Sequence, residues 1–137
     1  WKLRSDIWNE FLHDDKLAYT YSERIGDQVD KLINEFKKNP STRQAYLSIW
    51  NPDLDIDKIG KERVPCTLGY HFMIRNDKME CRYMIRSNDL FTHWANDVWL
   101  AITLQEYIAS FVGVQVGRFE QYICSLHSYL KDLKNVF

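Results

Sequence analysis

The chain has 137 residues, of which 45% are hydrophobic and 15% aromatic, and its formal net charge at pH 7 is -1. This length and composition favour one globular domain over residues 1–137 with a substantial hydrophobic core. The near-neutral charge argues against a nucleic-acid-binding surface, and the sequence shows no apolar run of membrane-spanning length and no signal-peptide pattern.

The cysteines and histidines indicate which disulfide and metal-binding classes the protein does not fit. Cys66, Cys81 and Cys124 are odd in number and none belongs to a Cys-x-x-Cys pair, and the four histidines also lack metal-ligand spacing. This pattern indicates neither a disulfide framework nor a zinc site. The sequence therefore predicts a reducing, cytoplasmic location and no bound metal.

The first part of the chain combines helical and extended patterns. Apolar residues at helical intervals predict an amphipathic helix over residues 1–12, and residues 17–24 are expected to be extended. A further helix is predicted to begin after the candidate N-cap Asp27 and to end at Asn39-Pro40, since proline disfavours helix in the residue before it.

A strand-rich region follows. Residues 44–50 read as a strand, and residues 53–63 read as a solvated polar loop because their aspartates lack a calcium-loop pattern. Residues 67–75 and 78–86 are predicted to be strands joined by a hairpin turn at Asn76-Asp77. The second of these strands alternates strictly between apolar and polar residues.

The last third begins with a long apolar helix, predicted over residues 95–112 and ending at Gly113. A strand over residues 114–122 and a short helix over residues 129–137 complete the chain. Mixed strands and helices in this order predict an α+β fold, with one mixed β-sheet and helices packed on it.

The polar stretch Arg86-Ser87-Asn88-Asp89 lies where the strand pattern gives way to the helix pattern, and Asp97 follows Arg86 by eleven positions. Polar groups in a connection before a helix are well placed to bind an anionic ligand. The alternative is that Asn96 or Asp97 caps the helix. Spacing alone favours the capping role.

This stretch resembles the nucleotide-binding segment of the thymidylate synthase and deoxycytidylate hydroxymethylase family. Other segments resemble the same family, in the same order along the chain: the arginine turn at 39–44, the strand end at 48–52, the Pro-Cys nucleophile loop Val64-Pro65-Cys66-Thr67 and the His-x-Tyr ribose motif within 125–129.

The resemblance covers residues 19–129 and implies a thymidylate synthase-like fold that dimerises through its sheet. Proteins of this family are normally longer. The sequence is therefore expected to lack the family's N-terminal part, with its arginine loop and proton-relay glutamate, and the C-terminal tail that closes over the folate.

Cys66 matches the family's nucleophile. A thiolate adds to C6 of a pyrimidine ring and makes C5 nucleophilic, so that C5 attacks the one-carbon unit of the cofactor 5,10-methylenetetrahydrofolate. Taken alone, a buried inert cysteine is the commoner case. The Pro-Cys context favours the nucleophile, whereas Cys81 and Cys124 are expected to be packing residues.

The resemblance assigns the substrate phosphate to Arg86 and Ser87, and to Arg43 reaching in from a neighbouring subunit. A guanidinium binds phosphate bidentately, and a hydroxyl adds one donor. A homodimer with a shared active site is therefore expected. Gln44 replaces the family's second arginine, which predicts weaker phosphate binding, and on its own Arg43 reads as a surface charge.

The resemblance assigns the sugar hydroxyl to His127 and Tyr129, and the pterin ring of the folate to Asp89. His127 and Tyr129 are two positions apart, so they point to the same side of an extended segment. The alternative for this pair is a buried histidine and tyrosine satisfied by the backbone. His71, within a predicted strand, is expected to be a structural hydrogen-bonding group.

Asp97 is expected to select the base. The corresponding residue is asparagine in thymidylate synthases and aspartate in deoxycytidylate hydroxymethylases. A carboxylate accepts from the cytosine amino group, whereas facing the uracil O4 acceptor would cost roughly 1–3 kcal/mol if buried. A register shift of one would give the role to Asn96 and restore a thymidylate synthase. His93 and Trp94 also depart from the family pattern.

The sequence therefore predicts a one-carbon transferase that hydroxymethylates the pyrimidine nucleoside monophosphate dCMP or CMP. Methylation of dUMP to dTMP is the alternative within the family. A non-catalytic nucleotide-binding or dimer-scaffold domain is the alternative outside it, because the glutamate region and the folate-closing tail are not recognisable. The sequence leaves ribose against deoxyribose, and methyl against hydroxymethyl product, open.

Overall fold

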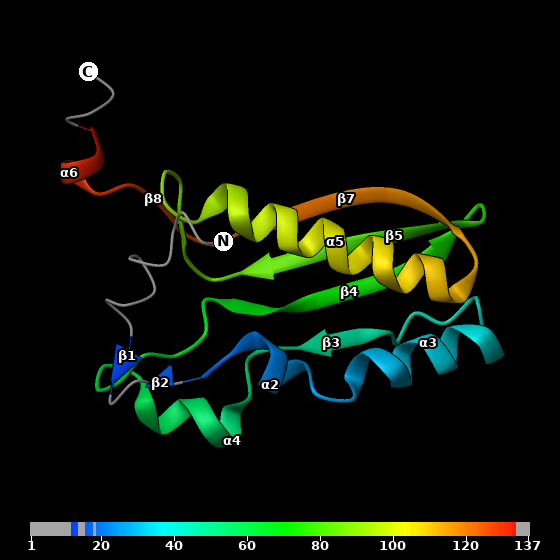
Figure 1. The fold of residues 1–137 in the computed structure, drawn as a ribbon, viewed down its shortest axis with the longest axis horizontal. Helices are drawn as coiled ribbons and strands as arrows, with labels where there is room; N and C mark the ends of the chain where they lie inside the picture. Colours follow the sequence, from blue (N-terminus) through cyan, green and yellow to red (C-terminus); the bar gives the residue numbers. More distant parts are fainter. Residues whose placement is uncertain (1–11, 14–15, 18, 134–137) are drawn as a thin grey trace.

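A four-stranded sheet in the order β3-β4-β5-β7 forms the centre of the fold (Figure 1). The structure is a computed structural model that describes residues 12–13, 16–17 and 19–133. Neighbouring strands are antiparallel except β5 and β7, which are parallel. This mixed sheet with packed helices confirms the predicted α+β class. The strands are β3 (Tyr46–Ser48), β4 (Thr67–Arg75), β5 (Lys78–Ile85) and β7 (Gln115–Ile123).

The β4–β5 hairpin sets the position of the candidate site. Asn76 and Asp77 have φ values of 51° and 57°, the left-handed conformation that a two-residue hairpin turn needs at both positions. The turn confirms the prediction. Since the strands pair along their whole length, Cys66 and Arg86 lie side by side at the far end, where the Arg86 N–H donates to the Cys66 carbonyl at 2.9 Å.

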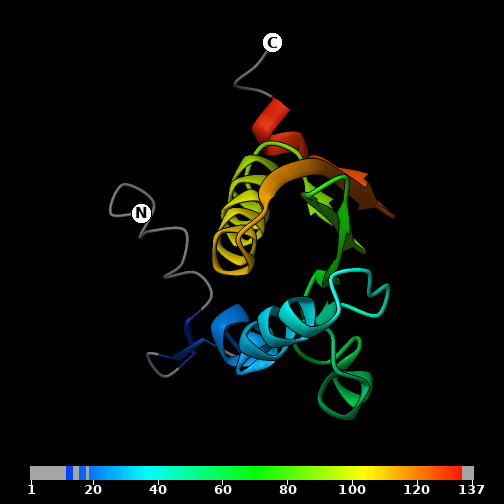
Figure 2. The ribbon, with the colours of Figure 1, turned by 90° about the vertical axis from the view of Figure 1, so that its right-hand side faces the viewer.

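Two long helices supply the core on one side of the sheet. Helix α3 (Gln28–Lys38) lies beside β3, and α5 (Trp94–Val112) packs on β5 and β7 (Figures 1 and 2). Gly113 ends α5 in the left-handed conformation, as predicted. Within the described residues, no helix combines the length and the apolar character needed to cross a membrane. The helices bury Leu32, Ile33, Phe36, Ala101, Gln105, Ile108 and Ala109.

A buried amide holds α5 against an irregularity in the sheet. The β5–β7 register shifts between Met79 and Cys81, and the Gln105 side-chain N–H donates to the Met79 carbonyl at 2.7 Å. Gly117 faces the same irregularity, where a Cβ atom would approach the Met79 carbonyl oxygen to 2.9 Å. The close approach therefore requires glycine at this position.

Two segments differ from their predicted structure near the N-terminal half. Part of the expected extended segment is helix α2 (Tyr21–Ile25), because Thr20 and Glu23 form a reciprocal capping box. The expected polar loop contains α4 (Pro52–Asp55) and the 3₁₀ turn η2 (Ile56–Lys58). The Asn51 side chain caps α4, and proline at the first helical position favours helix.

Other boundaries also differ. Helix α5 begins at Trp94 after His93, so the interpretation of Asn96 or Asp97 as its N-cap was wrong, and Asp97 lies in the first turn. Asp27 precedes α3 as predicted but makes no capping hydrogen bond. Of the predicted first helix, residues 1–11 lie outside the described residues, and Leu12 belongs to β1 (Leu12–His13), which pairs with β2 (Lys16–Leu17).

A short parallel pair beyond the main sheet joins distant segments. Strand β6 (Asn88–Asp89) pairs with β8 (Leu126–His127), with Asp89 opposite His127. The pair places the residues after Arg86 beside the His-x-Tyr segment. Helix α6 (Leu130–Leu133) follows and is shorter than predicted within the described residues.

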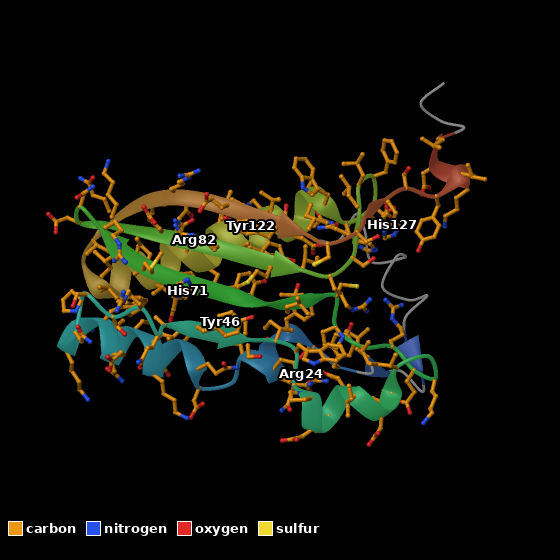
Figure 3. All side chains as sticks on the ribbon, turned by 180° about the vertical axis from the view of Figure 1, so that it is seen from behind. Arg24, Tyr46, His71, Arg82, Tyr122 and His127 are labelled. Atoms are coloured by element: carbon orange, nitrogen blue, oxygen red, sulfur yellow. The ribbon has the colours of Figure 1, made fainter. Side chains whose placement is uncertain are left out.

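The sheet face opposite α5 carries polar and aromatic side chains (Figure 3). Arg82 bridges Glu80 at 3.1 Å and Glu120 at 3.0 Å. Tyr46 and Tyr122 are 42% and 53% exposed, and none of the described helices covers this face at β5 and β7 (Figure 2). This exposed surface, running from Tyr46 to Tyr122 across the strands, is called the open sheet face below.

Candidate active site

Arg86 fixes the loop that carries Cys66. Its Nε donates to the Pro65 carbonyl at 3.0 Å, and its Nη2 donates to the Val64 carbonyl at 3.1 Å. Together with the backbone N–H bond to the Cys66 carbonyl, these two guanidinium contacts tie Arg86 to three successive residues. The structure thus brings together two motifs that are 20 positions apart in the sequence.

Cys66 and Arg86 line one pocket of about 370 Å³, together with Trp50, Arg63 and neighbouring loop residues. The volume is in the range of small-molecule sites. Cys66 is half-buried, and its thiol is free. A thiol and two guanidinium groups on one cavity can serve an anionic substrate that is attacked by sulfur.

Ser87, His127 and Tyr129 form a second group next to Arg86. The Ser87 hydroxyl lies 3.4 Å from His127 Nδ1, and the His127 ring packs edge-on against the Tyr129 ring at 5.3 Å between centroids. Tyr129 is 54% exposed. The β6–β8 pairing brings the predicted ribose motif next to the predicted phosphate segment. His127 of this motif is labelled in Figure 3.

Asp97 is a half-buried carboxyl in the first turn of α5. Burial raises the pKa of Asp97 to about 6, while the nearby Asn88 amide acts in the opposite direction. The Asp97 carboxyl is therefore partly protonated near neutral pH, whereas an exposed aspartate is almost fully ionised there.

Three tyrosines lie within electrostatic range of Asp97. Burial raises the pKa values of Tyr83, Tyr70 and Tyr21 above the usual range, and the negative charge of Asp97 adds to the rise in each case. The Tyr83 hydroxyl lies 2.8 Å from the Thr67 hydroxyl, and the Thr67 N–H donates to the Tyr21 hydroxyl at 3.3 Å. Because Thr67 follows Cys66, this cluster connects the nucleophile loop to the surroundings of Asp97.

Asp89 is buried, and its carboxylate orders the loop after β6. Its Oδ1 accepts from the Phe91 N–H at 3.1 Å and from the Thr92 N–H at 3.3 Å. Burial opposes ionisation, but these bonds, with one from the Thr92 side chain, hold the pKa of Asp89 below its usual value. Asp89 is therefore an ionised acceptor.

Arg43 lies apart from the other predicted site residues. It is exposed, and its carbonyl accepts a hydrogen bond from His71 Nε2 at 3.0 Å, which gives His71 the structural role predicted for it. His71 is roughly 15 Å along β4 from Cys66 at the ordinary rise of a strand. Within this chain, Arg43 does not reach the pocket of Cys66.

A protein-family model described as "Thymidylate synthase" matches residues 2–137. The chain belongs to the thymidylate synthase family. A putative thymidylate synthase of Methanocaldococcus jannaschii is 34% identical over 127 residues, which are 91% of this chain and 57% of the relative. A deoxyuridylate hydroxymethyltransferase of Bacillus phage SP01 is 39% identical over 110 residues, which are 77% of this chain and 28% of that protein.

A solved structure has the same fold. The thermostable thymidylate synthase A of Bacillus subtilis superposes with a TM-score of 0.80 at 26% identity, covering 95% of this chain and 50% of that chain. This thymidylate synthase-family chain thus spans about half the length of that solved protein and of the archaeal relative.

Sequence reasoning missed part of this thymidylate synthase-family site. Asn88, Thr67 and the tyrosines around Asp97 were not identified as candidates. The inward alternation of Tyr83 was a usable signal, since a buried tyrosine needs a partner for its hydroxyl. Among the described residues, no group of three or more histidine, cysteine, aspartate or glutamate side chains is arranged to hold a metal.

Proposed function

We propose that this chain carries the nucleotide site of a one-carbon transferase that hydroxymethylates C5 of dCMP or CMP. The observation that carries the proposal is the shared pocket of Cys66 and Arg86, with the Ser87–His127 pair beside it. Similarity to proteins named thymidylate synthase and deoxyuridylate hydroxymethyltransferase supports transfer to a pyrimidine nucleotide.

Each residue of the proposed nucleotide site has a separate role. Arg86 and Ser87 bind the phosphate, and His127 with Tyr129 binds the sugar hydroxyl. The Cys66 thiolate adds to C6 of the base, which breaks the C5–C6 double bond and leaves C5 as an enamine-like carbon. Holding the phosphate and the nucleophile with one arginine fixes the ring above the sulfur.

The cofactor proposed is 5,10-methylenetetrahydrofolate, which supplies the one-carbon unit when bound. Asp89 suits its pterin ring, because a buried, ionised carboxylate accepts hydrogen bonds from ring N–H and amino groups. The loop bonds from Phe91 and Thr92 hold that carboxylate in place. Asp89 thereby positions the folate relative to the nucleotide.

Asp97 is proposed to read the cytosine edge, and its replacement tests that role. Tritium release from 5-tritiated dCMP, CMP and dUMP, measured with methylenetetrahydrofolate, is expected to favour a cytosine nucleotide. Asp97→Asn is expected to shift the dUMP-to-dCMP ratio towards dUMP by about 10- to 100-fold, the worth of one or two buried hydrogen bonds. The matched control is Asn96→Asp, which leaves Asp97 unchanged and tests the register.

Each other outcome of the release assay contradicts part of the proposal. Release chiefly from dUMP in the unaltered protein would contradict the cytosine preference and favour a reaction of dUMP, to which the names of the relatives point. Release from no nucleotide would favour the non-catalytic nucleotide-binding or scaffold domain. Unchanged selectivity in Asp97→Asn would show that another residue reads the base.

We also propose that two copies pair through the open sheet face, so that Arg43 of each copy completes the phosphate site of the other. The exposed tyrosines on that face and the distance of Arg43 from its own Cys66 support this. Mixing inactive Cys66→Ala and Arg43→Ala proteins is expected to restore about one quarter of the activity, since half of the dimers then hold one intact site.

The controls for this mixture are each variant alone, measured at the same total concentration. Sedimentation should show a dimer for both variants and for the mixture. A monomer, or a mixture with no activity above that of the separate proteins, would contradict the shared site.

A further inference from the structure

The side-chain amide of Asn88 is buried, and it makes no hydrogen bond of standard geometry to another described residue. Its side chain is 2% exposed, and within the described part of the chain neither Nδ2 nor Oδ1 has a partner of standard geometry. Its backbone is fixed, because its N–H donates to the Ser125 carbonyl at 2.9 Å and β6 pairs with β8. A buried unpaired amide is costly, so its presence here suggests a partner that arrives with a ligand.

The Asn88 amide faces Asp97. It lies close enough to favour the ionised carboxyl, although the two groups do not form a hydrogen bond of standard geometry. Among the described residues, the phenols of Tyr21, Tyr70 and Tyr83, from α2, β4 and β5, also interact electrostatically with this carboxyl. Asn88 thus supplies a side-chain amide next to the carboxyl that is proposed to recognise the base.

A carboxyl with one proton does not by itself distinguish the two pyrimidine edges. Against cytosine, the protonated oxygen donates to N3 and the other oxygen accepts from the amino group. Against uracil, the protonated oxygen donates to O4 and the other accepts from N3–H. The two patterns differ in which carboxyl oxygen carries the proton, so selectivity requires a group that makes the oxygens unequal.

We propose that the Asn88 amide N–H donates to the Asp97 oxygen that accepts from the cytosine amino group, and so keeps the proton on the oxygen facing N3. This inference rests on the proposed function and adds a specificity-determining residue to it. Asn88 is a positioning residue, because it acts through Asp97. The bond between the Asn88 N–H and the Asp97 oxygen is proposed for the complex with the nucleotide.

The test measures nucleotide binding and the titration of Asp97 in the same variants. Asn88→Leu keeps the approximate volume and removes the donor, and Asn88→Ala removes the donor without adding a charge beside Asp97. Calorimetric binding of dCMP and dUMP is expected to show a selectivity ratio lowered about 5- to 10-fold in both variants. Carbon-13 titration of aspartate carboxyls, with Asp97→Asn assigning the signal, is expected to show a raised Asp97 pKa.

Leu126→Ala is the matched control, because Leu126 pairs with Asn88 across β6 and β8 and is 52% exposed. It is expected to leave both the selectivity ratio and the Asp97 titration unchanged. If Asn88→Leu does not fold, Asn88→Ala provides the test on its own.

The outcomes separate this inference from the function on which it rests. An unaltered protein that binds neither nucleotide overturns the proposed function, and the inference with it. A selective protein whose ratio survives both Asn88 substitutions overturns the inference alone. The same holds if the ratio falls equally in Leu126→Ala, since the effect would then come from the strand pair.

Discussion

Replacing Cys66 by serine is expected to lower tritium release from the preferred nucleotide on the order of 10⁴-fold or more. A serine hydroxyl is not ionised near neutral pH and is a much weaker nucleophile than a thiolate, so it is expected to add poorly to C6 of the base. The measurement is single-turnover release at saturating nucleotide, which reports the chemical step separately from product release. Binding of the nucleotide is expected to remain, because Arg86, the proposed phosphate ligand, is unchanged.

The other cysteines provide the controls. Cys124 is exposed, and Cys124→Ser is expected to keep release within about twofold of the unaltered protein. Cys81 is buried in the core, where burial raises the pKa of its thiol to about 12, so it is not a nucleophile at neutral pH. A Cys66→Ser protein that retains release, or a Cys124→Ser protein that loses it, would show that the nucleophile is misassigned.

Replacing Asp55 by alanine is expected to lower the free energy of unfolding by about 3–5 kcal/mol, because it leaves the buried Arg24 guanidinium without its counter-ion. Asp55 is fully buried and accepts from Arg24 Nη1 at 3.1 Å and Nη2 at 2.7 Å. It also accepts from the Asn51 N–H at 2.9 Å. The pair therefore anchors the segment between β3 and the Cys66 loop to α2. Urea unfolding gives the free energy directly.

An exposed ion pair of the same chain isolates the effect of burial. Asp27 and Lys31 lie 2.7 Å apart on the surface of α3, and Asp27→Ala is expected to leave the free energy of unfolding nearly unchanged. The double variant Arg24→Met and Asp55→Leu is expected to recover much of the loss, since no unpaired charge remains. Equal losses for Asp27→Ala and Asp55→Ala would contradict the anchoring role.

The elements that the sequence predicted correctly have a strong hydrophobic periodicity or residues typical of a turn. The hairpin over 67–86 followed from alternation around Asn76-Asp77, and the helix over 95–112 followed from its long apolar pattern and Gly113. Helix α2 was missed because five residues give little periodicity. The Thr20–Glu23 capping box was the available signal there, and Asn51-Pro52 was the corresponding signal for α4.

The residues of the candidate site were also only partly predictable from the sequence. Cys66, Arg86, Ser87 and His127 belong to motifs that the sequence displays, and the structure brings these motifs together. The partners of Asp97 were not predictable, because contacts between α5, β5, β4 and α2 depend on packing between distant segments. The Asn88 amide lacks any local pattern that would distinguish it from a turn residue.

The guanidinium of Arg86 contacts the carbonyls of both Pro65 and Val64 and so restrains the loop that carries Cys66. We expect this restraint to reduce the ordering of the loop that must accompany nucleotide binding. Nucleosides without a phosphate are therefore expected to lose mainly affinity and to react at a similar rate once bound. Arg86→Lys is expected to loosen the Cys66 loop although it keeps the charge, because an ammonium lacks the planar fork that spans two carbonyls.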